Sequence, residues 1–422
     1  MKRVLLLFAA ISLFSSCDWR EFDDLSKSAT VQVIDGPDSY SGSIFGQVVT
    51  PLSEGNFRAP GLYVVAGTGE GSFALVDFRS GTPKTSILPV QLDSAFTVQA
   101  LVSLQGAEGA WRFAASSLSH IYFFTLTEDE NGFTLTRDQS LDISMESEPG
   151  FGRNILPVDQ PGESYAVAST HKLFYAAQDA TVIETLQLDT LTLPTDDGVG
   201  FNVPFLGTFV HGGVNWLVTG GSTNPGAGQH WAMLFIDLDD TSHRVLYTPA
   251  QSLTGAQVCT VKLYDLDGDS HKDLVVGAGQ NIYVFMNDPL GVELPFASDP
   301  DYTLHDQSRN IGQIIEFGDL TGNNQPEIIA SDPSYQAQSD DELGSVSIFS
   351  NTFIGGTSQT VTPLLSLSPN SKDEKKFGSS LIALPTVNFP GRDELVIGGM
   401  NSSYLFYITG IEGDNSPAAD PR

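Results

Sequence analysis

The chain has 422 residues, with 41 glycines, 26 phenylalanines and 12 tyrosines. Its 51 acidic and 20 basic residues give a formal net charge of −31, which argues against nucleic acid or an anionic membrane surface as a partner. The length exceeds that of a usual single core, so several domains or one closed repeat architecture are required. The composition indicates many short strands with tight turns, so we expect an all-β fold.

The first sixteen residues have the pattern of a secretory signal peptide. Lys2 and Arg3 precede a mostly apolar stretch at 4–14, which is too short to span a bilayer as a permanent helix. Small residues then precede Cys17, and the segment resembles a bacterial lipoprotein signal, although Phe14 stands where that family prefers leucine. The resemblance implies a chain held at the bacterial cell envelope, on the outer-membrane surface or in the periplasm. The lipid on Cys17 would be its one membrane contact, and ordinary secretory cleavage is the alternative.

Seven similar units follow an acidic tether at 17–29 and a short strand pattern at 30–35. A period of this size is typical of solenoids and propellers. The units begin near residues 45, 96, 151, 201, 254, 311 and 377. Their unequal spacing is expected when loop insertions decorate one constant unit.

Each unit contains three strand patterns, and most contain a fourth. The fourth patterns lie at 85–90, 133–137, 181–188, 244–247 and 361–367. Four antiparallel strands in each repeat are typical of a propeller blade. Because the seventh unit ends without a fourth strand, we expect strand 30–35 to complete it and to close the ring. The sequence therefore predicts a monomeric, seven-bladed β-propeller of four-stranded antiparallel blades at 30–411 and a disordered tail at 412–422.

The fifth unit holds the most specific motif, DLDGDSHKD, between strand patterns at 258–263 and 274–276. Oxygen donors at its first, third, fifth, seventh and ninth positions can converge on a hard cation, and this donor set suits Ca²⁺. They are Asp265, Asp267, Asp269, the carbonyl of His271, and Asp273. The alternative is a solvated Asp-rich hairpin, in which four crowded carboxylates would repel one another.

Residues 255–288 resemble the FG-GAP repeat, the blade unit of the integrin α-subunit propeller and of many bacterial surface proteins. Thr254-Gly255 stands where that family has Phe-Gly. The resemblance implies that the Ca²⁺ loop joins the first two strands of a blade, and that its ligands are the five residues named above.

The sixth unit repeats the loop frame with fewer charges. Its corresponding residues are Asp319, Thr321, Asn323, the carbonyl of Gln325, and Glu327. Two carboxylates in place of four should weaken Ca²⁺ binding, so a second Ca²⁺ and a hydrogen-bonded turn both remain open. In the seventh unit Pro390 and Arg392 fall within the frame and argue against a site there.

No catalytic motif is evident, because the seven histidines are scattered and no metalloprotease or nucleophile spacing occurs. We therefore expect non-catalytic binding of an envelope or extracellular protein or glycan, with Ca²⁺ as the cofactor. A polysaccharide-active hydrolase or lyase, and a structural subunit of an envelope complex, are the alternatives. Long loops at 222–230 and 331–343, with Trp231 and Tyr335, offer groups suited to protein or sugar contacts, or are solvated insertions.

Overall fold

The computed structural model describes residues 30–36, 45–46, 48–54, 57–66, 72–80, 83–90, 97–104, 106, 109–147, 150–158, 164–169, 172–177, 183–187, 205–222, 231–240, 242–247, 258–291, 294–306, 308–336, 343–354, 360–369, 376–385, 391–399 and 404–409. The predicted signal peptide, Cys17, the acidic tether and the tail lie outside these residues. Within the described part, no helix has the length and apolar character needed to cross a membrane.

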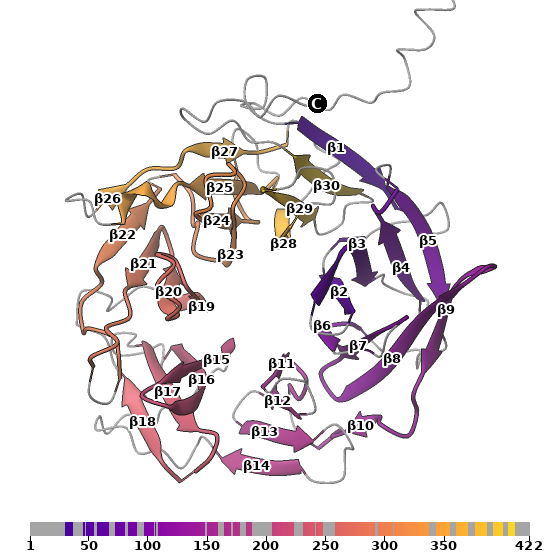
Figure 1. Cartoon of the computed structure of the whole chain (residues 1–422), viewed down its shortest axis with the longest axis horizontal. Coiled ribbons are helices and arrows are strands. Elements are labelled where there is room, and N and C mark those ends of the chain that lie inside the picture. Colours follow the sequence, from indigo (N-terminus) through magenta and orange to yellow (C-terminus); the bar gives the residue numbers. More distant parts are fainter. Residues whose placement is uncertain are drawn as a thin grey trace, which may run out of the picture.

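The described residues form small, mostly antiparallel sheets set in a ring that resembles a β-propeller (Figure 1). Their helical structure is one 3-10 turn, η2 (Asn351–Phe353). The predicted all-β class is therefore confirmed.

Five of the sheets have four strands each. They are built from β2 (Val49–Glu54), β3 (Phe57–Ala66), β4 (Ser72–Asp77) and β5 (Lys84–Pro89); from β11 (Asn154–Pro157), β12 (Ser164–Ala168), β13 (Lys172–Ala177) and β14 (Ile183–Gln187); from β15 (Phe205–His211), β16 (Val214–Ser222), β17 (Trp231–Asp237) and β18 (Arg244–Tyr247); from β23 (Ile314–Gly318), β24 (Glu327–Asp332), β25 (Ser345–Phe349) and β27 (Leu365–Leu367); and from β28 (Phe377–Pro385), β29 (Asp393–Gly399), β30 (Tyr404–Thr409) and β1 (Thr30–Asp35).

Two further sheets have five strands each. They are built from β6 (Ala100–Leu104), β7 (Ala110–Ser116), β8 (His120–Asp129), β9 (Gly132–Arg137) and β10 (Ile143–Ser144), and from β19 (Val258–Tyr264), β20 (Asp273–Ala278), β21 (Asn281–Phe285), β22 (Tyr302–His305) and β26 (Thr360–Val361). The sequence predicts seven blades of four strands, and among the described residues five sheets have that form.

The two extra strands have different origins. In the first five-stranded sheet, β9 and β10 pair with successive parts of the long β8, so two short segments share one outer edge. In the second, β26 pairs in parallel with β22. The strand patterns of the fifth unit do not predict β22, which is the fourth strand of this sheet. The fourth strand expected at 361–367 is present as β27, but it is shorter than predicted: β26 belongs to a different sheet, and Pro363 between the two has no N–H for a ladder.

The N-terminal strand belongs to the sheet that ends the chain. β1 pairs antiparallel with β30, from Thr30 opposite Thr409 to Asp35 opposite Tyr404, and the strand order is β1-β30-β29-β28. Ile34 is buried in the cluster between this sheet and the β2–β5 sheet. The prediction that strand 30–35 completes the last unit is confirmed.

At two of the described seams, neighbouring sheets meet through close backbone contacts at the start of a unit. A Cβ on Gly277 would collide with the carbonyl oxygen of Gly312, which opens the next unit. The same relation joins the last unit to the first, where a Cβ on Gly398 would collide with the carbonyl oxygen of Gly46. Ser380 Oγ also donates to that carbonyl at 2.7 Å. Glycine is therefore required at these seams because the backbones touch.

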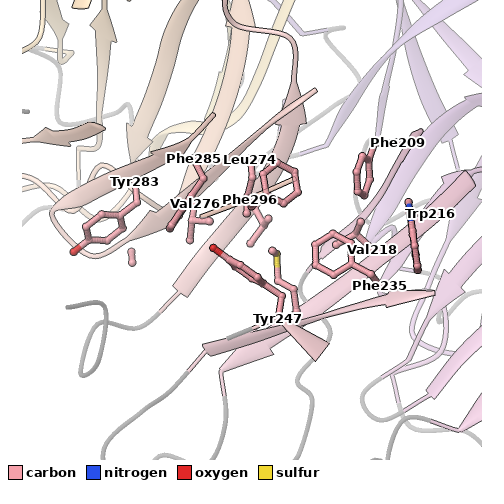
Figure 2. Packing of buried hydrophobic residues seen from close by; sticks show 13 residues of the cluster. Phe209, Trp216, Val218, Phe235, Tyr247, Leu274, Val276, Tyr283, Phe285 and Phe296 are labelled. Atoms are coloured by element: carbon pink, nitrogen blue, oxygen red, sulfur yellow. The ribbon is translucent and has the colours of Figure 1, made fainter. Parts of the chain in front are cut away.

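The hydrophobic core consists of clusters between adjacent sheets. Figure 2 shows the cluster between the β15–β18 sheet and the β19–β22 strands, which includes Phe209, Phe235, Tyr247, Leu274 and Phe285. Its rings meet edge to face, with 5.7 Å between the centroids of Phe209 and Phe235 and 6.3 Å between those of Tyr247 and Phe285. This packing holds the start of β20 in place, and the predicted Ca²⁺ loop ends there.

Candidate metal centre

The predicted Ca²⁺ loop is the turn between β19 and β20, the first two strands of its sheet. Leu274, just after the loop, is buried in the cluster with the β15–β18 sheet. Leu266, inside the loop, is buried on the other side, in the cluster with the β23–β27 sheet. The loop is therefore anchored in the cores on both sides of its own sheet, while residues 267–270 at its tip are exposed.

Three of the predicted ligands come together. One carboxylate oxygen each from Asp265, Asp267 and Asp269 lies within 4.8 Å of the others. Backbone N–H groups fix this arrangement, because Asp265 accepts from Gly268 at 2.8 Å and from Ser270 at 2.9 Å. Positive φ angles of 80° at Gly268 and 72° at Ser270 let these N–H groups turn inward.

Little positive charge offsets the three carboxylates. The side chain of Lys272 turns away, and its Nζ donates to the carbonyl of Thr208 at 2.8 Å. His271 Nδ1 lies 3.4 Å from Asp269 Oδ2 and provides charge only when protonated. Burial, together with the nearby charges of Asp269 and Asp265, raises the pKa of Asp267. The loop therefore holds an excess of negative charge that a cation would relieve.

The other two predicted ligands hold the loop together. Asp273 is buried, and its oxygens accept from the N–H groups of Leu266 at 2.9 Å and Asn287 at 2.8 Å. Burial, helped by the charges of Asp267 and Asp269, raises the pKa of Asp273 to about 7. The backbone N–H of His271 donates to Asp269 at 2.7 Å. Asp273 thus closes the loop from below the three gathered carboxylates.

The second loop has the same backbone shape. Asp319 accepts from Gly322 at 2.7 Å and from Asn324 at 2.7 Å, at the spacing seen for Asp265. Gly322 and Asn324 have positive φ angles of 77° and 61°. Leu320 is buried in the next cluster, as Leu266 is in the first loop.

The chemistry of the second loop differs because Thr321 replaces an aspartate. Its hydroxyl donates to Glu327 Oε1 at 2.9 Å, while Glu327 Oε2 accepts from Leu320 N at 2.8 Å and Thr321 N at 3.1 Å. Burial raises the pKa of Glu327 to about 7. A Cβ on Gly322 would lie 2.7 Å from Nε of Arg392, so a guanidinium lies beside this loop. Asn323 and Gln325 bond to each other, from Gln325 N to Asn323 Oδ1 at 2.8 Å. Hydrogen bonds between its own groups therefore close this loop.

Two features of these loops are not predicted from the motif alone. The leucine after the first aspartate anchors each loop, as the burial of Leu266 and Leu320 shows. The signal for this role is the same apolar residue at the second position of both frames. Asp393, at the start of β29, clamps the second loop by accepting from Asp319 N at 2.8 Å and donating to Asp319 O at 2.6 Å.

A near copy of the first motif lies one unit earlier. Residues 237–244 read DLDDTSHR, against DLDGDSHK at 265–272. This segment connects β17 to β18, the third and fourth strands, rather than the first and second. Asp237 accepts from Asp239 N at 2.9 Å, and its other oxygen lies 3.3 Å from His243 Nδ1. Among the residues described by the structure, the acids of this turn do not form a metal-sized group.

The predicted contact loops are described only in part. Residues 223–230 and 337–342 lie outside the described residues, as does the side chain of Trp231. Tyr335 lies beneath the guanidinium of Arg309, whose Cζ is 4.8 Å from the ring centroid. Arg309 in turn donates to Asp306 at 2.9 Å. A cation–π contact with Arg309 therefore holds the side chain of Tyr335 in place.

Comparisons of the chain with protein-family models and with curated protein sequences gave no match. The likeness to the FG-GAP repeat therefore rests on the residues of the loop and of the strands beside it.

Proposed function

We propose that this chain is a seven-bladed, FG-GAP-like β-propeller that binds one Ca²⁺ at 265–273 and, without catalysis, binds an envelope or extracellular protein or glycan. The seven repeat units in the sequence support seven blades. The two five-stranded sheets fit this number if each is a four-strand blade with one addition, β10 on β8 beside β9 and β26 on β22. A lipid on Cys17 would hold the propeller at the bacterial envelope.

The gathering of Asp265, Asp267 and Asp269 within 4.8 Å carries the metal proposal. Ca²⁺ accepts flexible shells of oxygen ligands, so these carboxylates, the carbonyl of His271 and solvent could complete its coordination. When bound, the cation would offset most of the negative charge of the three carboxylates and stabilise the folded chain. We assign one Ca²⁺ rather than two, because Thr321 and Asn323 stand in the second loop where the first has Asp267 and Asp269, so no three carboxylates gather there among the described residues.

Calorimetric titration of the full-length chain with Ca²⁺ tests this assignment. We expect one site in the wild type, none in Asp267→Ala, and one retained in Glu327→Gln. A wild-type chain that takes up no Ca²⁺ would remove the metal proposal. Two sites, with one lost in Glu327→Gln, would extend the metal to the second loop.

Binding and anchoring have their own tests. A glycan array and a panel of envelope proteins presented to the intact chain should reveal a partner that binds. That partner should be recovered chemically unchanged after binding. A polysaccharide cleaved on incubation with the chain would contradict the non-catalytic assignment. Metabolic labelling with a fatty acid should mark the wild type and leave Cys17→Ser unlabelled.

A further inference from the structure

Leu290 is the most exposed large hydrophobic side chain that the structure describes, at 86%, and Val210 follows at 58%. Single exposed apolar residues are ordinary on protein surfaces. These two, however, come from neighbouring sheets, since Val210 lies near the end of β15 and Leu290 lies between β21 and β22. Their placement therefore decides whether they act together.

Hydrogen bonds bring the two segments together across the seam. His211 Nε2 lies 3.0 Å from the carbonyl oxygen of Gly291, so the residues next to Val210 and Leu290 are bonded to each other. In a four-strand meander, the first-to-second and third-to-fourth connections leave the sheet at the same end. Both side chains therefore lie on the face of the ring that carries the Ca²⁺ loop.

The turn that presents Leu290 is fixed in shape. Gly291 N donates to Asp288 O at 2.9 Å, and Leu290 N donates to Asp288 Oδ1 at 2.9 Å. Pro289 fixes its own φ, and Asp288 N donates to Pro295 O at 2.8 Å. A partner that covers Leu290 would not have to order this turn, so little entropy would be lost on binding.

The surroundings of the pair are strongly negative. Outside the proposed metal group, the exposed acids on this end of the two sheets are Asp239, Asp240, Asp288, Asp299 and Asp301. Lys272 adds one positive charge near Val210, where its amino group donates to the carbonyl of Thr208, so the acids outnumber it. A second copy of the chain, with its formal net charge of −31, would be repelled here, and a cationic partner would be attracted.

We propose that Leu290 and Val210 form a docking surface for a basic, amphipathic segment of another protein. Its apolar side chains would cover the pair, and its lysines or arginines would meet the surrounding carboxylates. The inference deepens the proposed binding function and rests on it, but it does not depend on the bound metal, which the Ca²⁺ titration tests separately.

The probe is a short lysine–leucine peptide, and its binding to the full-length chain is measured by fluorescence anisotropy at physiological salt. We expect Leu290→Ser to weaken binding roughly tenfold or more, since it removes most of a leucine's burial. Val210→Ser should weaken it less, because more of Val210 is already covered. The matched control is Leu118→Ser, at a 51% exposed leucine in the turn between β7 and β8 on the opposite face.

Two further measurements separate docking from general charge attraction. Pro289→Ala keeps the leucine but loosens its turn, so it should weaken binding with an unchanged unfolding midpoint. A lysine–serine peptide should bind less tightly than the lysine–leucine peptide. Equal affinities for Leu290→Ser and Leu118→Ser, or for the two peptides, would overturn the proposal.

Discussion

Replacing Asp267 by asparagine should have opposite effects on stability without and with Ca²⁺. Its carboxylate has an oxygen within 4.8 Å of those of Asp265 and Asp269. At 4.8 Å each such pair repels by about 0.9 kcal/mol in water and about half of that at physiological ionic strength. In the absence of Ca²⁺, Asp267→Asn should therefore raise the free energy of unfolding by about 1 kcal/mol.

Calcium should reverse the order of the two proteins. A ligand present at a hundredfold excess over its Kd stabilises the folded state by about 2.7 kcal/mol. The variant loses a charged oxygen ligand, so it should keep only a small part of this gain. With Ca²⁺ in excess, the wild type should become the more stable protein by roughly 1 to 2 kcal/mol.

Denaturant unfolding in EDTA and in excess Ca²⁺ measures both effects on the same samples. Glu130→Gln is the matched control, because Glu130 is an exposed acid in the turn between β8 and β9, outside the loop. Its stability should shift equally in the two buffers. If Asp267→Asn also shifts equally in both buffers, the reasoning from charge repulsion and metal binding is wrong.

Three other perturbations test the seams and the buried acid. Gly398→Ala should destabilise the chain by about 1 to 3 kcal/mol, because the new Cβ collides with the Gly46 carbonyl. It should also expose strand 30–35 to proteases, and a cleavage pattern like that of the wild type would contradict ring closure at this seam. Because the pKa of Glu327 is raised, its contribution to the free energy of unfolding is complete below pH 4.5 and is lost as the pH rises toward 7. Measured in EDTA, Glu327→Gln should therefore reduce the fall in stability between pH 4.5 and 7 by up to about 3 kcal/mol. Parallel pH profiles for the variant and the wild type would refute this reasoning. Arg79 donates to Asp77 and to Glu128 of the next sheet, at 2.9 Å each, so Arg79→Lys should cost about 1 kcal/mol in thermal unfolding. Glu128→Gln should reduce that difference without removing it, because the bonds from Arg79 to Asp77 remain; a difference that is unchanged in Glu128→Gln would contradict the contact between the sheets.

Much of the fold can be predicted from the sequence because each unit repeats its own signals. Alternating apolar strands and turn residues indicate an all-β chain, and the unpaired pattern at 30–35 indicates which strand completes the last sheet. The division of 361–367 between two sheets could not be predicted, since it depends on the neighbouring β22 offering an edge to β26. The doubling of the outer edge along β8 has a similar cause, because the ten-residue length of β8 leaves room for two partners.

The candidate site shows the same division. The spacing of Asp265, Asp267 and Asp269 in the sequence predicts their convergence, because oxygen donors at alternate positions of a short loop match the ligand spacing of a Ca²⁺ site. The segment at 237–244 has a related pattern, but Asp240 and Thr241 stand where the loop has Gly268 and Asp269. It also joins the third and fourth strands of its sheet rather than the first and second, which only the tertiary structure shows. Only the tertiary structure also brings His211 to Gly291, and with it two exposed apolar residues from separate sheets.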